Sequence, residues 1–205
     1  MWWRAPIANV DAFASESFID ELAALAGLDT LGLRKKHLIG ERGRALIEKL
    51  AAVSGWFSRR KNEGWGVAIT ECFGSVVGQV VKVSRRQNGK LAIDKVFAVI
   101  DCGWYVNPDI IRAQVEGSIV MALGAAISHA TTFKNGSRVQ NNFNSYQMPR
   151  FNEIPETEVY IMDNDAPPGG VGEPALSAFA PALCNAIFDL TGKRIRKLPF
   201  KLDDP

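Results

Sequence analysis

GWGVAITECFGSVVGQVVKVS, residues 64–84, has the composition of two β-strands with a glycine between them. Glycine accepts the conformations of a tight turn, so Gly74 predicts a hairpin that joins residues 64–73 to residues 75–84. A third strand-like stretch, KLAIDKVFAVIDCG at 90–103, follows a turn that contains the sequence QNG. Three consecutive strands joined by tight turns predict an antiparallel meander.

Two helical patterns precede these strands. In ESFIDELAALAG (16–27) apolar residues recur at helical spacing, and Gly27 provides a stop signal. In GRALIEKLAAVSG (43–55) three apolar residues fall on one face of a helix. Both apolar faces are predicted to pack in the core: Phe18, Ile19, Leu22, Leu25 and Ala26 in the first helix, and Leu46, Ile47 and Leu50 in the second.

The second half of the chain mixes helices and strands. The longest helical pattern covers residues 108–128, and another helix is predicted at 174–191, bent or restarted at Pro181. Because helices and strands do not alternate strictly, we predict an α+β fold with a mixed, largely antiparallel sheet packed with helices. The remaining expected elements are a hairpin turn at 133–139, a strand at 157–162 and a closing strand at 194–200.

The composition is that of an ordinary globular protein. The chain has 205 residues, of which 47% are hydrophobic and 22% charged, and its formal net charge is +2. Its short basic clusters, at 34–36, 59–61 and 193–197, are expected to be solvated surface, so no nucleic-acid partner is predicted. The longest apolar run, 117–127, is shorter than the ~20 residues that span a bilayer, so no membrane span is predicted. The opening MWW indicates a piece cut from a longer polypeptide.

Cysteines and histidines are few and scattered. Cys72, Cys102 and Cys184 form no CxxC pair, which excludes a zinc ribbon or an iron–sulfur cluster held by this chain alone. His37 and His129 are expected to be surface or packed residues. No metal ligands are therefore predicted in the chain, and a bound metal would take its ligands mostly from a cofactor.

The stretch PPGGVGEPALSAFAPAL (167–183) places one carboxylate, Glu173, between a glycine-rich turn and a helix. Pro174 suits the first helical position, and Gly192 suits the position after the last turn. The residues alone leave two roles for Glu173, a helix cap or a positioned catalytic base. A loop for nucleotide phosphates is a weaker alternative, because the stretch lacks both the GK[ST] ending and the GxGxxG spacing.

Four segments together resemble the xanthine dehydrogenase family: WRAPIANVDAFASESFIDELA (3–23), DCGWYVNPDIIRAQVEGSIVMALGAAI (101–127), NFNSYQMPRFNEIPETEVYIM (142–162) and PPGGVGEPALSAFAPALCNAIFDLTGKRIRKLPF (167–200). The chain is most similar to the molybdopterin-binding large subunits of the isoquinoline 1-oxidoreductase and aldehyde dehydrogenase type. Members are much longer, so the resemblance implies that residues 1–205 are the C-terminal half of the molybdenum-cofactor-binding region, within a longer chain.

The resemblance also implies a chemistry. Such enzymes oxidise an N-heterocycle or an aldehyde with oxygen derived from water, and the glutamate of GVGEP, here Glu173, would be the general base. Molybdenum is held by molybdopterin, with the dinucleotide form expected. Gln114, Val171, Gly172 and Arg4 would contact this cofactor, although Pro6 and Ile7 after Arg4 depart from the glycine-bearing pattern of the family.

Several partners are implied in the same way. They are the upstream half of the large subunit, a small subunit with [2Fe–2S] clusters, and a small-molecule substrate. The alternative is a structural or docking fragment that holds no cofactor and has no activity by itself. The resemblance leaves the substrate open, and it allows a cytoplasmic or a periplasmic location.

Overall fold

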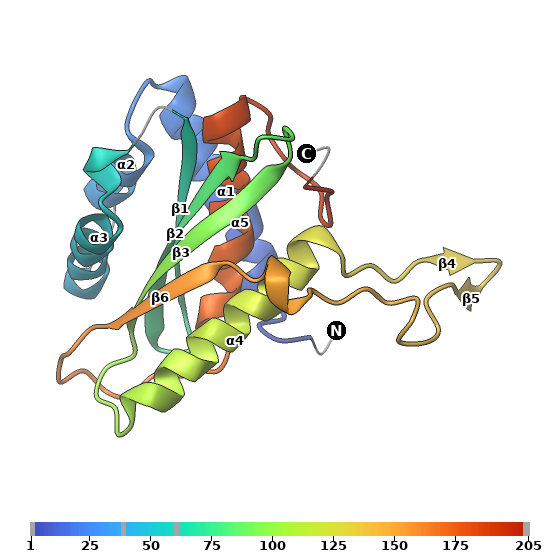
Figure 1. Cartoon of the computed structure of the whole chain (residues 1–205). Coiled ribbons are helices and arrows are strands. Elements are labelled where there is room, and N and C mark those ends of the chain that lie inside the picture. Colours follow the sequence, from blue (N-terminus) through green and yellow to red (C-terminus); the bar gives the residue numbers. More distant parts are fainter. Residues whose placement is uncertain (1–2, 38–39, 60–61, 203–205) are drawn as a thin grey trace.

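A four-stranded sheet forms the centre of the computed structural model, which describes residues 3–37, 40–59 and 62–202 (Figure 1). Trp2 and the last two residues of the basic cluster at 59–61 lie outside this description. The sheet has the order β1-β2-β3-β6, where β6 runs parallel to β3 and the other pairs are antiparallel. The predicted meander and the mixed sheet are confirmed. The sheet strands are β1 (Glu63–Cys72), β2 (Ser75–Arg85), β3 (Leu91–Asp101) and β6 (Glu156–Ile161).

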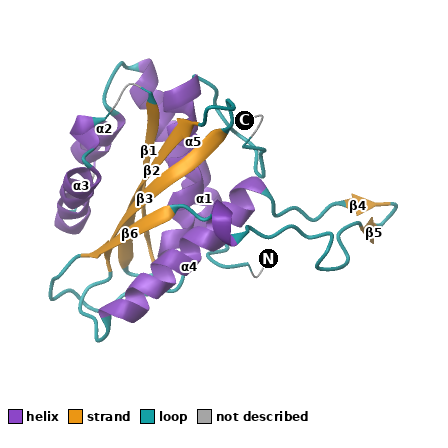
Figure 2. Ribbon diagram, viewed as in Figure 1, coloured by secondary structure: helices purple, strands orange, loops and turns teal. Residues whose placement is uncertain are grey.

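Helices cover both faces of the sheet (Figure 2). One face carries α1, α4 and α5 over the larger core cluster, and the other carries α2 and α3 over a second cluster that includes Trp56 and Trp65. The backbone of α5 lies so close to β1 that a Cβ atom on Gly66 would come within 2.1 Å of the Ala182 carbonyl oxygen. Glycine in this strand therefore permits the close packing. The helices are α1 (Ala8–Leu25), α2 (Thr30–His37), α3 (Glu41–Ser54), α4 (Pro108–Ile127) and α5 (Pro174–Thr191), with short 3-10 turns at Trp56–Ser58 and Phe151–Glu153.

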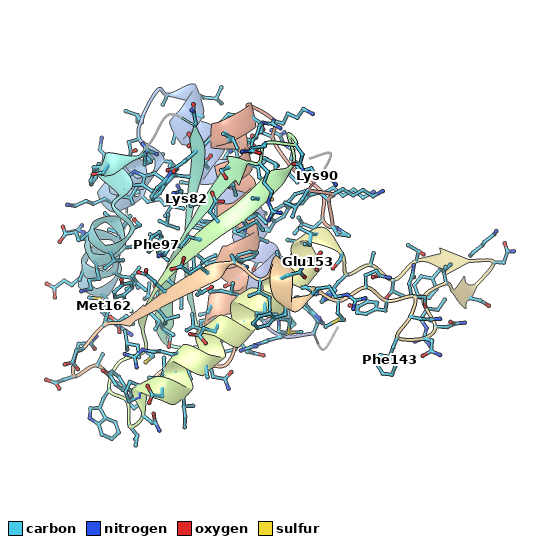
Figure 3. The ribbon with its side chains drawn as sticks, viewed as in Figure 1. Lys82, Lys90, Phe97, Phe143, Glu153 and Met162 are labelled. Atoms are coloured by element: carbon cyan, nitrogen blue, oxygen red, sulfur yellow. The ribbon has the colours of Figure 1, made fainter. Side chains whose placement is uncertain are left out.

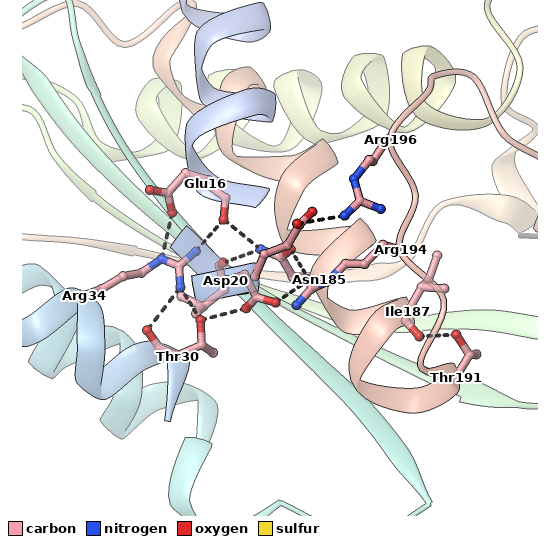
Figure 4. A network of polar contacts seen from close by, with 11 residues as sticks. Glu16, Asp20, Thr30, Arg34, Asn185, Ile187, Thr191, Arg194 and Arg196 are labelled. Atoms are coloured by element: carbon pink, nitrogen blue, oxygen red, sulfur yellow. Dashed lines mark hydrogen bonds and ion pairs between the residues drawn. The ribbon is translucent and has the colours of Figure 1, made fainter. Parts of the chain in front are cut away.

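The buried face of α1 differs from the prediction. Phe18 and Leu25 are 60% and 85% exposed, whereas Glu16 and Asp20 are buried. Both carboxylates are neutralised by arginines from other segments, Arg34 and Arg194, which lie 2.8 Å and 2.5 Å away (Figure 4). These two arginines belong to basic clusters that were expected to be solvated, and that expectation is wrong for them. Ion pairing permits the polar face of the helix to turn inward.

The other helices follow their sequence patterns. Leu46, Ile47 and Leu50 of α3 are buried, as are Ile111, Val115, Ile119 and Leu123 of α4. Within the described residues, α4 alone has the length and mean hydropathy that could cross a membrane, and it packs here against α5 and β6. Helix α5 continues through Pro181 without a restart.

The predicted closing strand at 194–200 is absent from the described structure. The segment is irregular and contains a cis peptide bond between Leu198 and Pro199. Its alternating charges have another cause, because Arg194 pairs with Asp20, and Arg196 pairs with Glu21 at 2.8 Å. Both carboxylates lie on α1, so the segment packs along a helix instead of joining the sheet.

A long arm projects from the body between α4 and β6 (Figure 3). It carries the predicted hairpin, formed by β4 (Phe133–Lys134) and β5 (Ser137–Arg138). Phe143, on the same arm, is 96% exposed. At the base of the arm, the ring of His129 stacks on Tyr146 with a distance of 5.1 Å between ring centroids.

Candidate functional site

The glycine-rich turn at 169–172 is held from both sides by the ends of sheet strands. The N–H of Gly170 donates to the carbonyl oxygen of Phe73 at 2.7 Å, in the turn between β1 and β2. The N–H of Gly169 donates to the carbonyl oxygen of Cys102 at 2.8 Å, just after β3. The buried hydroxyl of Ser75 donates to the carbonyl oxygen of Gly170 at 2.7 Å. The sheet therefore fixes the path of the chain before it enters α5.

The glycines of this turn face different surroundings. A Cβ atom on Gly169 would lie 2.4 Å from the Ser75 hydroxyl oxygen and 2.6 Å from the Gly74 carbonyl oxygen, so no larger residue fits. A Cβ atom on Gly172 would meet only the side-chain oxygen of Gln114, at 3.9 Å. Gly169 is thus required by the fold, while Gly172 leaves its surface open to an approaching group.

Glu173 occupies the N-cap position of α5, but its side chain makes no capping hydrogen bond to that helix. Its Oε1 atom accepts a hydrogen bond of 3.4 Å from the N–H of Ala5. Ala5 is fully buried and has a φ of 54°, in the left-handed region that residues with a side chain rarely adopt. This long hydrogen bond connects the carboxylate to the N-terminal segment and not to the helix. The geometry therefore disfavours a pure capping role.

Arg4 connects the other predicted site residues. Its Nε atom donates to the carbonyl oxygen of Gly172, and its Nη2 atom donates to both oxygens of Gln114, at 3.2 Å for the backbone and 3.0 Å for the side chain. Burial lowers the pKa of Arg4, and the charge of Glu173 acts in the opposite direction. The structure brings Arg4, Gln114, Gly172 and Glu173 into one cluster. Val171 adjoins it, although its side chain packs against the core.

The thiol of Cys72 lies close enough to Glu173 for their charges to interact, and the sequence analysis did not assign it to the site. The thiol of Cys72, at the end of β1, is half-buried, and burial raises its pKa, as do the charges of Glu173 and Glu71, while a hydrogen bond with Ser177 lowers it. The hydroxyl of Ser177 also contacts the hydroxyl of Thr70, at 3.0 Å. No local motif marks Cys72, because only the pairing of β1 with α5 brings it to the site.

Comparison with known proteins identifies the family. Residues 44–155 match the family described as molybdopterin cofactor-binding domain. The chain belongs to this family. The chain is 31% identical over 195 residues to the beta subunit of isoquinoline 1-oxidoreductase from Brevundimonas diminuta, a match that covers 92% of this chain and 25% of the relative. One nicotinate dehydrogenase subunit from Pseudomonas putida is 30% identical, and the match covers 97% of this chain and 18% of the relative.

Solved structures support the same fold. The aldehyde oxidoreductase from Desulfovibrio desulfuricans superposes with a TM-score of 0.83 at 15% identity, over 99% of this chain and 41% of that chain. Quinoline 2-oxidoreductase from Pseudomonas putida 86 superposes with a TM-score of 0.74 at 12% identity, over 88% of this chain and 49% of that chain. The chain spans a quarter or less of the length of the two sequence relatives above. The predicted family and fold are confirmed.

The open side of the turn suits an anionic cofactor. Among the described residues, the N–H groups of Val171, Gly172 and Glu173 have no hydrogen-bond acceptor. They lie at the N-terminal end of α5, which favours negative charge. A molybdopterin carries oxygen atoms and phosphate that can accept these hydrogen bonds, so these residues fit the group.

Across the described residues, no three His, Cys, Asp or Glu side chains are grouped so that they could hold a metal ion. Two surface cavities of about 720 and 460 Å³ lie elsewhere and include none of the cluster residues. The cluster is an open surface, with Gln114 exposed and Glu173 half-buried.

Proposed function

We propose that this chain is the C-terminal half of the cofactor-binding region in a molybdenum hydroxylase large subunit, with Glu173 as the general base. The reaction converts a C–H bond of an N-heterocycle or an aldehyde and one water molecule into C–OH, two protons and two electrons. The observation that carries the proposal is the placement of the Glu173 carboxylate, which the Ala5 N–H holds beside the open face of Gly172.

Each residue of the cluster then has a defined task. When bound, the molybdenum cofactor accepts the two electrons and supports oxygen transfer from water. Glu173 takes up a proton at its carboxylate, for which it must lie within ~3 Å of the proton donor. Gln114 can donate a hydrogen bond to the cofactor through its side-chain nitrogen, while its side-chain oxygen accepts from Arg4. The unpaired N–H groups of Val171 and Gly172 would bind acceptor atoms of the cofactor.

The cofactor and partners follow from the same proposal. We infer the dinucleotide form of molybdopterin and a separate small subunit that carries [2Fe–2S] clusters. This division agrees with the cysteines, because Cys72, Cys102 and Cys184 are free and the sequence has no CxxC pair. The rest of the large subunit would supply further cofactor contacts on the open side of the cluster.

The decisive experiment replaces Glu173 by glutamine in the complete enzyme and measures turnover and molybdenum content together. Loss of a positioned general base should lower the rate by ~10²–10⁴ with full molybdenum occupancy. Glu116→Gln is the matched control, since Glu116 is exposed on the same helix as Gln114. Retained activity in Glu173→Gln would refute the base assignment. Loss of both activity and molybdenum would show that Glu173 is needed for cofactor binding, and would leave its role as a base undecided.

A second candidate function is a docking fragment without cofactor, and the open, half-exposed cluster favours it. The two functions are compatible, because one half of a shared site can be inert alone. The purified 205-residue chain is expected to contain no stoichiometric molybdenum and to show no substrate-dependent dye reduction. Stoichiometric molybdenum or dye reduction in the isolated chain would refute the idea that the site needs the other half of the large subunit.

A further inference from the structure

The ion pair between Arg42 and Asp101 contacts the two segments that hold the glycine-rich turn: the turn between β1 and β2, and the end of β3. Arg42, near the start of α3, donates through Nη2 to Oδ1 of Asp101 at 2.7 Å and to the Asp101 carbonyl oxygen at 3.1 Å. Both Nη atoms of Arg42 also lie 3.3 Å from the carbonyl oxygen of Gly74. One guanidinium therefore joins the end of β3 to the turn between β1 and β2.

Asp101 also forms hydrogen bonds with residues that follow β3 and precede the glycine-rich turn. It is buried, and its Oδ1 atom accepts a hydrogen bond of 3.1 Å from the N–H of Gly103. Burial acts to raise the pKa of Asp101, but hydrogen bonds from Arg42, Asn164 and Gly103 hold it below its usual value. Asn164 in turn accepts a hydrogen bond of 2.9 Å from the N–H of Ala166. The carboxylate thus orders the chain that leads into the turn.

The segments joined by Arg42 and Asp101 are those that hold the turn. Phe73 and Cys102 supply the carbonyl oxygens bonded by Gly170 and Gly169, and the N–H of Trp104 donates to Ala166 at 2.9 Å. The four hydrogen bonds of Arg42 described above all go to Gly74 and Asp101, so they act on Glu173 only through these segments.

We propose that Arg42 and Asp101 are positioning residues, which set the location of Glu173 through the turn at 169–172. The role rests on the proposed function of Glu173 as base. An arginine suits it because its planar guanidinium can hold two loops at once, which the single ammonium group of lysine cannot do with the same geometry. A buried carboxylate left without its partner is costly, so the pair is maintained in the folded state.

The first test uses hydrogen–deuterium exchange on the 205-residue chain with Arg42→Lys and Arg42→Gln. The hydrogen-bonded amides within residues 166–173, those of Ala166, Gly169 and Gly170, should exchange on the order of tenfold faster, while those of β2 and β3 keep their protection. Lys35→Gln is the control, because Lys35 forms an exposed ion pair with Glu48 across α2 and α3. Unchanged exchange of these three amides in a folded Arg42→Gln chain would overturn the proposal. If that variant does not fold, Asp101→Asn, which keeps an acceptor for Gly103, takes its place under the same criterion.

The second test uses the complete enzyme. Arg42→Lys should lower kcat by on the order of 10- to 100-fold, since a small misplacement of a reacting group has effects of this size. KM and molybdenum content should remain unchanged, and the pH profile of kcat should shift, because the surroundings of the base change. Faster exchange at 166–173 with normal kcat would refute the positioning role. Full activity of Glu173→Gln would instead refute the proposed function, while the exchange experiment would still decide whether the pair holds the turn.

Discussion

The Nε atom of Arg4 donates a hydrogen bond to the carbonyl oxygen of Gly172, 168 positions further along the chain. The same guanidinium bonds to Gln114, on a third segment. Three motifs that are far apart in sequence therefore meet at one side chain. Through Nε and Nη2, Arg4 links Gln114 to the turn, and its contact with the cofactor stays a prediction.

Replacing Arg4 by lysine should weaken this junction. A lysine cannot reach the three acceptors of Arg4 in the same geometry, so the free energy of unfolding should fall by about 1 kcal/mol. Urea unfolding of the 205-residue chain measures the change. Arg112→Lys, at an exposed ion pair with Asp109 on α4, is the control and should stay within about 0.5 kcal/mol of the parent chain. Equal losses in the free energy of unfolding for Arg4→Lys and Arg112→Lys would show that Arg4 does not stabilise the contact between Gln114 and the turn.

Two glycines of the turn, Gly169 and Gly172, give a matched pair of alanine variants. Gly169→Ala would force a Cβ atom to within 2.4 Å of the Ser75 hydroxyl oxygen, and should destabilise the fold by about 1–3 kcal/mol. Gly172→Ala meets only Gln114, at 3.9 Å, and should fold normally. In the complete enzyme, however, the added methyl group at Gly172 should obstruct the cofactor. Thermal unfolding measures the first effect and molybdenum per chain the second. Normal molybdenum content in Gly172→Ala would show that Gly172 does not contact the cofactor.

The buried ion pair of Glu16 and Arg34 should be a major determinant of stability. The Oε2 atom of Glu16 accepts hydrogen bonds of 2.8 Å from both the Arg34 Nε atom and the N–H of Ile69. Arg34→Leu leaves this carboxylate buried without its cation, so it should cost about 3–5 kcal/mol. Lys35→Leu removes an exposed pair on the same helix and should cost at most about 1 kcal/mol. Chemical denaturation compares them, and similar losses would show that Glu16 is not effectively buried.

That ion pair also explains why the predicted core face of α1 was wrong. Apolar spacing locates one face of a helix, but it does not say which face the rest of the chain covers. The partners of Glu16 and Asp20 lie 18 and 174 positions away, at Arg34 and Arg194, and no local pattern shows them. The polar face is buried because these distant arginines neutralise it.

The meander and α5 were predicted correctly from local signals. The meander has glycine turns between strand-like runs, and α5 begins at Pro174 and is followed by Gly192, which adopts a left-handed φ of 73°. Resemblance to a family indicated Glu173, Gln114 and Arg4, and the structure brings all three together. Ala5 and Cys72 could not be found in this way, because their positions depend on a left-handed backbone and on the packing of β1 against α5.

His129 provides a prediction about acidic pH. Both ring nitrogens are buried without a hydrogen-bond partner among the described residues, and the ring lies against Gly124 and Tyr146. Burial lowers the pKa of His129. The unfolded chain therefore binds a proton at a higher pH than the folded chain. The stability due to the neutral ring is present above the unfolded pKa of ~6.5, and it is lost as the pH falls toward the lower folded pKa.

The free energy of unfolding should thus decline between about pH 7 and pH 5, and His129→Phe should remove part of this decline. Phenylalanine keeps a ring that can stack on Tyr146 but cannot take up a proton. Because the ring anchors the base of the arm, hydrogen exchange at residues 129–150 should also accelerate at about pH 5 in the parent chain, after correction for the intrinsic effect of pH, and less in the variant. His37→Gln, at an exposed histidine at the end of α2, is the control. An equal pH dependence in the parent chain and in His129→Phe would show that His129 is not the group responsible.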